Sequence, residues 1–340
     1  MTNRRPRILV DNKIPFIEGR LDACADVSYL APEEFTPETV RDADGLIIRT
    51  RTKCNAALLD GSKVKFIATA TIGKDHIDLE YCRQKGITAR NAVGCNAPGV
   101  AQYVWSFLLR NGFTPGKSKL GIVGYGAIGS IVGEWARQTD TPILICDPPR
   151  AENGFTDIDY KPLDDVLREC DAVTFHTPLT FSGPHKTYHM IGKHELDLMK
   201  PGVILINAAR GGVVEESALI EAIKSKRLTA IVDVWEGEPE INRELLEMAH
   251  GATQHIAGYS HEGKIRATRM SLDAVEEFFG IECDKSGLEA PEPGVGEITP
   301  QMIIESFDPR EEMDKLRKNP ENFEILRETY KYRHEVLHGV

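Results

Sequence analysis

Short apolar runs rich in β-branched residues alternate with amphipathic stretches along most of the chain. Runs typical of buried strands occur at 7–11, 25–30, 44–49, 65–70 and 87–90. Between the last two, residues 79–86 have the spacing of a short amphipathic helix. Alternation of this kind is typical of right-handed βαβ crossovers, so the first part of the chain is predicted to form a parallel sheet.

A second series of the same kind follows a long apolar helix predicted at 96–110. Two such series favour an α/β protein with two Rossmann-like, doubly wound parallel-sheet lobes and a cleft between them. The stretch at 271–279 is expected to pack back on the first lobe. The strands predicted in the second series are 119–126, 141–147, 171–178, 202–208, 229–234 and 252–258, and its helices include 215–227 and 241–250.

The composition changes after Gly280. Residues 287–300 are rich in Pro and Gly, which indicates a linker. Residues 309–336 are highly charged with a sparse apolar stripe, as in a helix that cannot bury itself on its own chain. We therefore expect residues 286–340 to be a short C-terminal dimerisation segment and the protein to be a homodimer.

Length and charge narrow the class of protein. A chain of 340 residues is expected to form two or three domains. No apolar run reaches the roughly 18 residues that a membrane span needs, and no secretory signal is visible, so we expect a cytoplasmic protein without a membrane partner. The net charge of −11 argues against nucleic acid as a partner. The seven cysteines show no CxxC pair, so we expect free thiols and no metal site.

A glycine-rich turn indicates a dinucleotide site. Gly124, Gly126 and Gly129 have the spacing G-x-G-x-x-G, follow a predicted strand and open a predicted helix. The first glycine allows a tight turn, the second lets the backbone approach a pyrophosphate, and the third lets helix and strand pack closely. The first helical turn, with Ala127 and Ile128, then places backbone N–H groups at the phosphates.

An acidic residue selects the cofactor. Asp147 ends the next predicted strand, 18 residues after the third glycine. A carboxylate at this point accepts hydrogen bonds from ribose hydroxyls and repels a 2′-phosphate, so NAD is expected. Arg150, nearby, leaves NADP as an alternative.

Three polar residues lie where strands predicted in the same lobe should end, and they could carry hydride chemistry. Oxidation of a 2-hydroxy acid needs a base for the hydroxyl proton, a cation for the carboxylate, and an acid that orients the base and stabilises its charged form. Histidine, arginine and a carboxylate suit these tasks. We therefore assign His255 as base, Arg210 as carboxylate clamp and Glu238 as partner of the histidine. Each could instead be a structural or solvated residue.

The motifs around these residues resemble the D-2-hydroxyacid dehydrogenase family. The glycine fingerprint, NAARG (207–211), DVWEGEP (233–239) and HIAG (255–258) are similar to that family, and the likeness covers most of residues 7–280. It implies a substrate-binding, flavodoxin-like domain (1–93 and 259–285) and an NAD-binding Rossmann domain (94–258). It also supports the catalytic trio. Further cofactor contacts implied by the resemblance are Thr177, Ala208, Ala209, Asp233 and Gly258.

A narrower likeness is to members of this family that act on a phosphorylated sugar acid. It is carried by LVDNKIPF (9–16), ATATIGKDHID (68–78) and HIAGYSHEGKIRAT (255–268), among other stretches. It implies substrate contacts for Thr50, Thr69 and Tyr259. It also implies a C-terminal dimerisation domain, which is shorter here between residues 280 and 310.

Basic residues of the predicted first lobe agree with an anionic substrate. A protein of net charge −11 that gathers cations on the loops of one lobe is suited to a doubly anionic ligand, here a small phosphorylated hydroxy acid. Two alternatives stay open, namely another dehydrogenase of the family, such as a phosphoglycerate or glyoxylate/hydroxypyruvate enzyme, and a non-enzymatic NAD(H)-sensing scaffold. The cations concerned are Arg49, Arg51, Lys53, Lys74, Lys264, Arg266 and Arg269.

Overall fold

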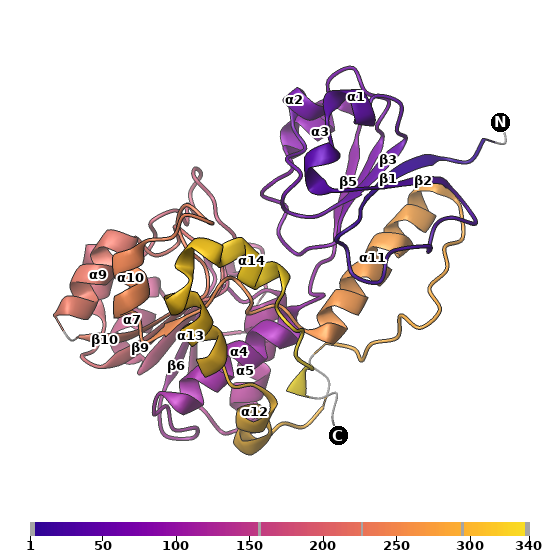
Figure 1. The fold of residues 1–340 in the computed structure, drawn as a ribbon. Coiled ribbons are helices and arrows are strands. Elements are labelled where there is room, and N and C mark those ends of the chain that lie inside the picture. Colours follow the sequence, from indigo (N-terminus) through magenta and orange to yellow (C-terminus); the bar gives the residue numbers. More distant parts are fainter. Residues whose placement is uncertain (1–3, 156–157, 226, 294–295, 337–340) are drawn as a thin grey trace. The chain divides into compact units, whose positions relative to one another are not determined.

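The computed structural model describes residues 4–155, 158–225, 227–293 and 296–336 (Figure 1). Lys226, inside a predicted helix, and Gly294 and Val295, inside the predicted linker, lie outside these ranges. The chain divides into two compact units, Met1–Asn96 with His261–Pro293, and Ala97–Ser260 with Gly294–Val340.

The first unit contains a parallel five-stranded sheet in the order β2-β1-β3-β4-β5. Alternate residues of each strand face opposite sides, so Leu9 joins one apolar cluster while Ile8 and Val10 join the other. Both faces are therefore buried, which explains the continuous apolar runs in the sequence. The strands are β1 (Arg7–Asp11), β2 (Asp26–Leu30), β3 (Gly45–Ile48), β4 (Phe66–Thr69) and β5 (Thr88–Asn91).

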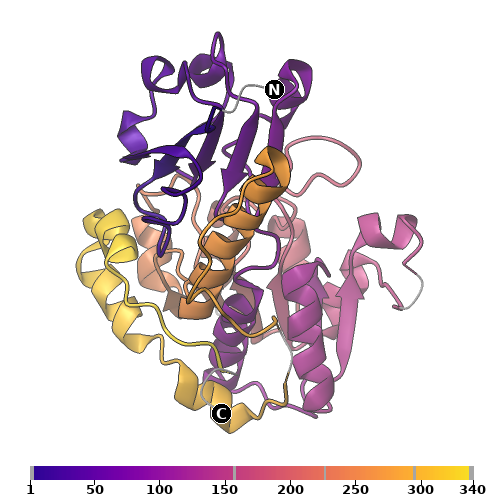
Figure 2. The same ribbon diagram turned by 90° about the vertical axis from the view of Figure 1, so that its right-hand side faces the viewer.

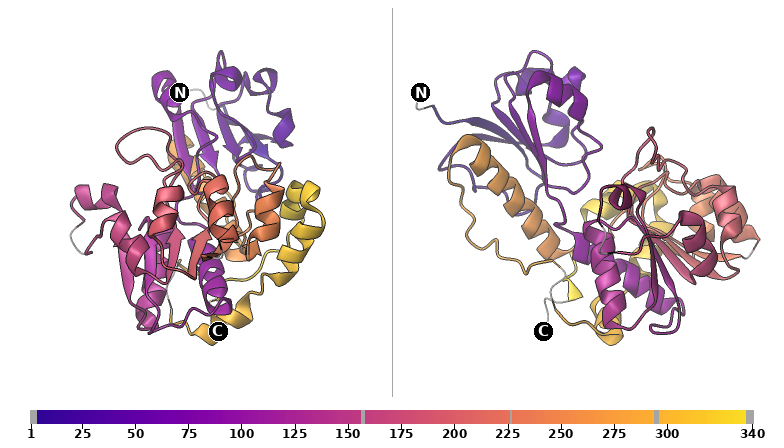
Figure 3. Two further views of the ribbon diagram at one scale, coloured as in Figure 1. Left: turned by 90° about the vertical axis from the view of Figure 1, so that its left-hand side faces the viewer. Right: turned by 180° about the vertical axis from the view of Figure 1, so that it is seen from behind.

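Helices cover the two faces of this sheet. On one face lie α1 (Pro37–Val40), α2 (Ala56–Leu59) and α3 (Leu79–Lys85). On the other lies α11 (His261–Phe279), which brings Leu272 and Val275 onto the sheet (Figure 3). The predicted return of 271–279 to the first lobe is confirmed, and the helix begins ten residues earlier than expected.

The second unit contains a parallel six-stranded sheet in the order β11-β10-β9-β8-β6-β7. The chain runs from β6 outward to β7 and then crosses to β8 on the other side. This reversal lies between β6 and β8, and in such sheets a ligand usually binds beyond the carboxyl ends of the strands at this point. The strands are β6 (Leu120–Val123), β7 (Ile143–Cys146), β8 (Ala172–Phe175), β9 (Val203–Asn207), β10 (Leu228–Val232) and β11 (Gly251–Ala252).

Helices pack on both faces of this sheet as well. Leu205 of β9 joins one apolar cluster, and Ile204 and Ile206 join the other. The helices between strands are α4 (Ala97–Arg110), α5 (Ala127–Gln138), α6 (Pro148–Glu152), α7 (Leu163–Glu169), α8 (Lys193–Leu198), α9 (Glu216–Lys224) and α10 (Arg243–Met248). The predicted α/β class with two parallel-sheet lobes is confirmed.

The C-terminal residues pack on the second unit as α12 (Pro300–Ser306), α13 (Arg310–Lys318) and α14 (Phe323–Glu328) (Figure 2). The expectation of one helix that cannot bury itself is wrong. A 3₁₀ turn beginning at Pro320 interrupts the helix, because proline lacks an N–H and clashes with the preceding turn. Leu316 and Phe323 are fully buried in the apolar cluster of this unit.

Within the described ranges, no helix is both long and apolar enough to cross a bilayer. The same ranges contain no group of three His, Cys, Asp or Glu side chains arranged to hold a metal ion.

Candidate active site

The glycine turn between β6 and α5 has the geometry that a dinucleotide requires. Gly124 has φ +90°, and a side chain there would meet the backbone of His176 at 2.8 Å. A Cβ on Gly129 would lie 2.2 Å from the Gly124 carbonyl oxygen, so helix and turn touch. A Cβ on Gly126, the N-cap of α5, would meet no heavy atom within 4 Å. Two glycines thus serve close packing, and Gly126 leaves its backbone open to a phosphate.

Asp147 is held beside this turn. Its Oδ2 accepts a hydrogen bond from the Tyr125 N–H at 2.7 Å, and its Oδ1 accepts one from the Arg150 N–H at 3.0 Å. The Arg150 guanidinium lies over the Phe155 ring, 4.2 Å from its centroid. The turn therefore presents a fixed carboxylate, which suits the ribose hydroxyls of NAD.

Just beyond the end of β8 lies a side-chain hydroxyl that makes no hydrogen bond to the described residues. The Thr177 hydroxyl is buried and has no hydrogen-bond partner among the described residues. Buried hydroxyls are normally satisfied, so an orphan beside the glycine turn fits a residue that bonds to a cofactor. Nδ1 of its neighbour His176 is buried as well, and burial lowers the pKa of this imidazole to about 3.

Arg210 stands on a loop held by the end of β9. The Asn207 side chain donates to the Arg210 carbonyl at 3.0 Å and accepts from the Ala209 N–H at 3.2 Å, and Arg210 Nη1 donates to the Ala209 carbonyl at 2.7 Å. A Cβ on Gly211 would lie 1.9 Å from the Trp235 carbonyl oxygen. The loop therefore packs backbone to backbone on the loop that leads to Glu238. Ala208 and Ala209 are buried in its first turn.

His255 and Glu238 form a direct pair. His255 Nδ1 lies 2.8 Å from Glu238 Oε2, and Glu238 Oε1 accepts from the Trp235 N–H at 3.0 Å. Burial raises the pKa of Glu238, but the charge and hydrogen bond of His255 outweigh it, so the net pKa is lowered. Glu238 is therefore a carboxylate that accepts from Nδ1–H. This leaves Nε2 of the imidazole to receive a proton from another molecule.

The strand predicted at 252–258 is wrong beyond its start, since β11 ends at Ala252. Asp233, which is 1% exposed, accepts from the N–H groups of Ile256 and Ala257 at 2.8 and 2.9 Å and so draws the chain into a loop. His255 has φ +57° there, a conformation that non-glycine residues rarely adopt and that is found at functional sites. The carboxylate of Asp233, implied as a cofactor contact, thus supports the loop that carries His255 and Gly258.

Within the first unit, the residues implied as substrate contacts differ in access. Thr50 is exposed just beyond β3. Thr69 is 1% exposed, and its hydroxyl lies 2.8 Å from that of Thr71, which donates to the Gly73 carbonyl. Its proton is therefore committed to Thr71, and His76 Nε2 lies 3.1 Å away on its other side. Thr69 can accept but not donate a further hydrogen bond.

Two of the predicted anion-binding cations are engaged within that unit. Arg49 pairs with the buried Asp11 at 3.1 Å. Arg266, 8% exposed, donates to the carbonyls of Cys95 and Pro291. Arg266 is thus a structural residue that ties α11 to neighbouring loops.

Comparison with known proteins agrees with these features. Residues 99–257 match the NAD-binding domain of D-isomer specific 2-hydroxyacid dehydrogenases. Proteins named erythronate-4-phosphate dehydrogenase are similar over 97% of this chain, with 47% identity in Bacteroides fragilis (97% of the relative), 42% in Porphyromonas gingivalis (94%) and 38% in Escherichia coli (92%). The chain belongs to the erythronate-4-phosphate dehydrogenase family. It is an NAD-dependent dehydrogenase, as predicted.

Solved structures of this wider family share the fold. A D-lactate dehydrogenase from Aquifex aeolicus, solved with NAD and lactic acid, has a TM-score of 0.68 and 26% identity, and the match covers 80% of this chain and 95% of that one. An NAD⁺-bound 3-phosphoglycerate dehydrogenase from Entamoeba histolytica has a TM-score of 0.68 and 29% identity, over 81% and 96%.

Two arginines of the C-terminal residues were missed by the sequence analysis. Arg327 on α14 lies over the Tyr259 ring, 5.6 Å from its centroid. Burial lowers the pKa of Arg327, but the nearby Tyr259 and Glu238 outweigh it and raise the pKa overall. Arg333 donates to the loop that follows His255. Both stand in a charged segment whose spacing gives no sign of its partners, so only the fold identifies them.

Proposed function

We propose that this dehydrogenase oxidises 4-phospho-D-erythronate at carbon 2 to 2-oxo-3-hydroxy-4-phosphobutanoate with reduction of NAD⁺, in the route to pyridoxal 5′-phosphate. The relatives that are 47% identical and carry the name erythronate-4-phosphate dehydrogenase support this substrate. The observation that carries the chemistry is the 2.8 Å contact between His255 Nδ1 and Glu238 Oε2.

The residues of the second unit would divide the work in three parts. With Nδ1–H donated to Glu238, the Nε2 lone pair of His255 takes the proton of the carbon-2 hydroxyl. The Glu238 carboxylate stabilises the imidazolium that forms. The Arg210 guanidinium holds the substrate carboxylate with its planar fork. When bound at the glycine turn and Asp147, NAD⁺ supplies the hydride acceptor for the hydrogen of carbon 2.

Steady-state rates with three acids test the substrate. We expect the highest kcat/KM with phosphoerythronate, and lower values with 3-phosphoglycerate and glycerate. A preference for 3-phosphoglycerate or for unphosphorylated glycerate would assign the protein to another branch of the 2-hydroxyacid dehydrogenases.

The variant His255→Ala tests catalysis separately from nucleotide binding. It should abolish turnover while NADH binding, followed by fluorescence titration, stays close to the parent value. Binding of NADH without turnover of any of the three acids by the parent protein would instead favour a sensing role.

We further propose that the protein works as a cytoplasmic homodimer. Sedimentation velocity at several concentrations should give the mass of two chains. A single species of one chain mass would contradict the dimer.

A further inference from the structure

The loop that carries His255 has little regular structure to hold it. It leaves β11 after two strand residues and reaches α11 at His261. On one side it is fixed by Asp233, which accepts from Ile256, Ala257 and the Thr253 hydroxyl. Two of those hydrogen bonds come from N–H groups of the loop. The carbonyl groups of the loop accept hydrogen bonds from Arg333 instead.

Arg333 collects these carbonyls. Its guanidinium donates through Nη1 at 3.1 and 3.2 Å to two of them, and through Nη2 to a third. The same group donates to α4 through Nη2 at 2.8 Å and through Nε at 2.9 Å, and it lies 4.4 Å from the centroid of the Phe307 ring. Its acceptors are the carbonyls of Ile256, Ala257, Tyr259 and Gly99, the Gln102 side chain and the Tyr330 hydroxyl.

All three nitrogen atoms of this guanidinium are therefore engaged, and its five N–H groups share six acceptors. A lysine would supply three donors from a single point and could not span the loop and α4 together. Beside it, Ser260 pairs with Arg333 in a parallel bridge, and the buried Ser260 hydroxyl donates to Glu335 at 2.6 Å. The last described residues thus bind the loop through its carbonyl groups and Ser260, whereas Asp233 accepts from its N–H groups.

We infer that Arg333 is a positioning residue for the acid–base pair, an inference that rests on the proposed role of His255. Three of its acceptors lie one, two and four residues after His255. Because His255 stands in the left-handed region, the hydrogen bonds to both the N–H and the carbonyl groups of the loop are needed to keep the imidazole on Glu238. The C-terminal residues complete the active site within one chain.

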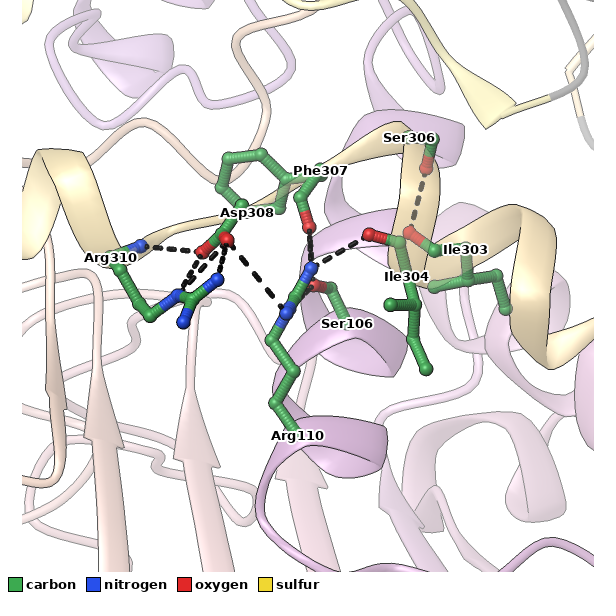
Figure 4. Close-up of polar contacts among 8 residues, drawn as sticks. All are labelled: Ser106, Arg110, Ile303, Ile304, Ser306, Phe307, Asp308 and Arg310. Atoms are coloured by element: carbon green, nitrogen blue, oxygen red, sulfur yellow. Dashed lines mark hydrogen bonds and ion pairs between the residues drawn. The ribbon is translucent and has the colours of Figure 1, made fainter.

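Arg333→Lys tests the inference, with Arg110→Lys as a matched control. Arg110 also joins α4 to the C-terminal residues through carbonyls, those of Ile304 at 2.7 Å and Phe307 at 3.1 Å, but it does not contact the loop (Figure 4). For Arg333→Lys we expect kcat with phosphoerythronate to fall about 100-fold, as for a misplaced catalytic group, with little change in the Kd of NADH. Arg110→Lys should keep the parent kcat.

Hydrogen exchange of the peptide covering residues 253–260 provides a readout that needs no substrate. Arg333→Lys should exchange the Ile256 and Ala257 amides at least about ten times faster than the parent, and Arg110→Lys should not. A parental kcat in Arg333→Lys, or a lower kcat with unchanged exchange of this loop, would overturn the inference. A parent without turnover on phosphoerythronate defeats the proposed function instead, and loop exchange still decides whether Arg333 holds the loop.

If Arg333→Lys does not fold, Ser260→Ala replaces it. This change removes the hydrogen bond to Glu335, which holds residues 333–335 against the same loop. It should raise loop exchange and lower kcat in the same direction by a smaller factor. No change in either quantity would count against the inference.

Discussion

At the scale of single residues, the contact between His255 and Glu238, two of the three residues proposed to be catalytic, could be predicted from the sequence, but the residues that support their loop could not. Arg210 and Glu238 each follow a predicted strand and His255 lies in the next one, so all three were expected at one edge of the sheet. The supports are long-range contacts. Asp233 lies 22 residues before His255, and Arg333 lies 78 residues after it, and no local pattern connects them. Side chains that bond to backbone groups leave no periodic signal in a sequence.

The pair of His255 and Glu238 predicts the effect of removing one charge. Glu238→Gln keeps an oxygen that can accept from Nδ1–H but cannot stabilise an imidazolium. We expect kcat to fall at least about 10²-fold, since loss of an orienting carboxylate in a related acid–base arrangement costs about 10⁴. Stopped-flow measurement of NADH formation gives the rate. NADH binding is the control, and a variant with the parental rate would show that the carboxylate is dispensable.

His176 predicts a dependence of stability on pH. Burial lowers the pKa of this imidazole to about 3, whereas in the unfolded chain it is near 6.5. Between these values the unfolded state binds a proton that the folded state excludes, so stability falls as the pH is lowered. From pH 7 to pH 5 the contribution is about 2 kcal/mol.

Urea unfolding at the two pH values measures this effect. His176→Asn should lose less stability than the parent protein between pH 7 and pH 5. Equal losses would show that His176 does not titrate on unfolding as expected.

At the scale of elements, the sequence predicted strands better than loops and ends. Parallel strands buried on both faces are continuous apolar runs, so β1 and β9 were found within two residues of their ends. Two errors have physical causes. The strand at 252–258 stops early because Asp233 takes the N–H groups that a ladder would use. The first half of helix α11 was not predicted, because it is mostly polar and no local pattern shows that it packs in the first unit.

The turn between β6 and α5 allows a matched pair of variants. Gly126→Ala adds a methyl group that meets no protein atom, while Gly129→Ala places one 2.2 Å from the Gly124 carbonyl oxygen. We expect Gly126→Ala to keep the parental melting temperature and to bind NADH at least about tenfold more weakly, because the methyl group would obstruct the pyrophosphate. Gly129→Ala should lower the melting temperature itself.

Calorimetry and NADH titration of both variants separate the two effects. Tight NADH binding by Gly126→Ala would show that the pyrophosphate does not approach the turn at this residue.

At the scale of the whole molecule, the C-terminal residues belong to the second unit in two ways. Their apolar side chains complete its core, and Arg333 donates hydrogen bonds to the loop that carries His255. The sequence analysis expected an exposed helix that would associate with a second chain. A sparse apolar stripe looks too small to bury a helix on its own chain when the surface that it packs on is unknown. The surface is supplied by the nucleotide-binding sheet and its helices, which are distant in sequence.

Two positions on α14 measure how much stability this packing contributes. Phe323 is fully buried in the core of the second unit, whereas Ile325 on the same helix is 59% exposed. Phe323→Ala should lower the free energy of unfolding by about 3–5 kcal/mol, because it removes a buried ring and leaves a cavity. Ile325→Ala, a change of similar kind at the surface, should lower it by no more than about 0.5 kcal/mol. Urea unfolding of both variants at one protein concentration gives the comparison.

A large loss of stability in Ile325→Ala would mean that the outer face of α14 is also covered in solution. Sedimentation of the same samples would then show a change in mass. Equal small losses would mean instead that the C-terminal residues contribute little to the core of the second unit.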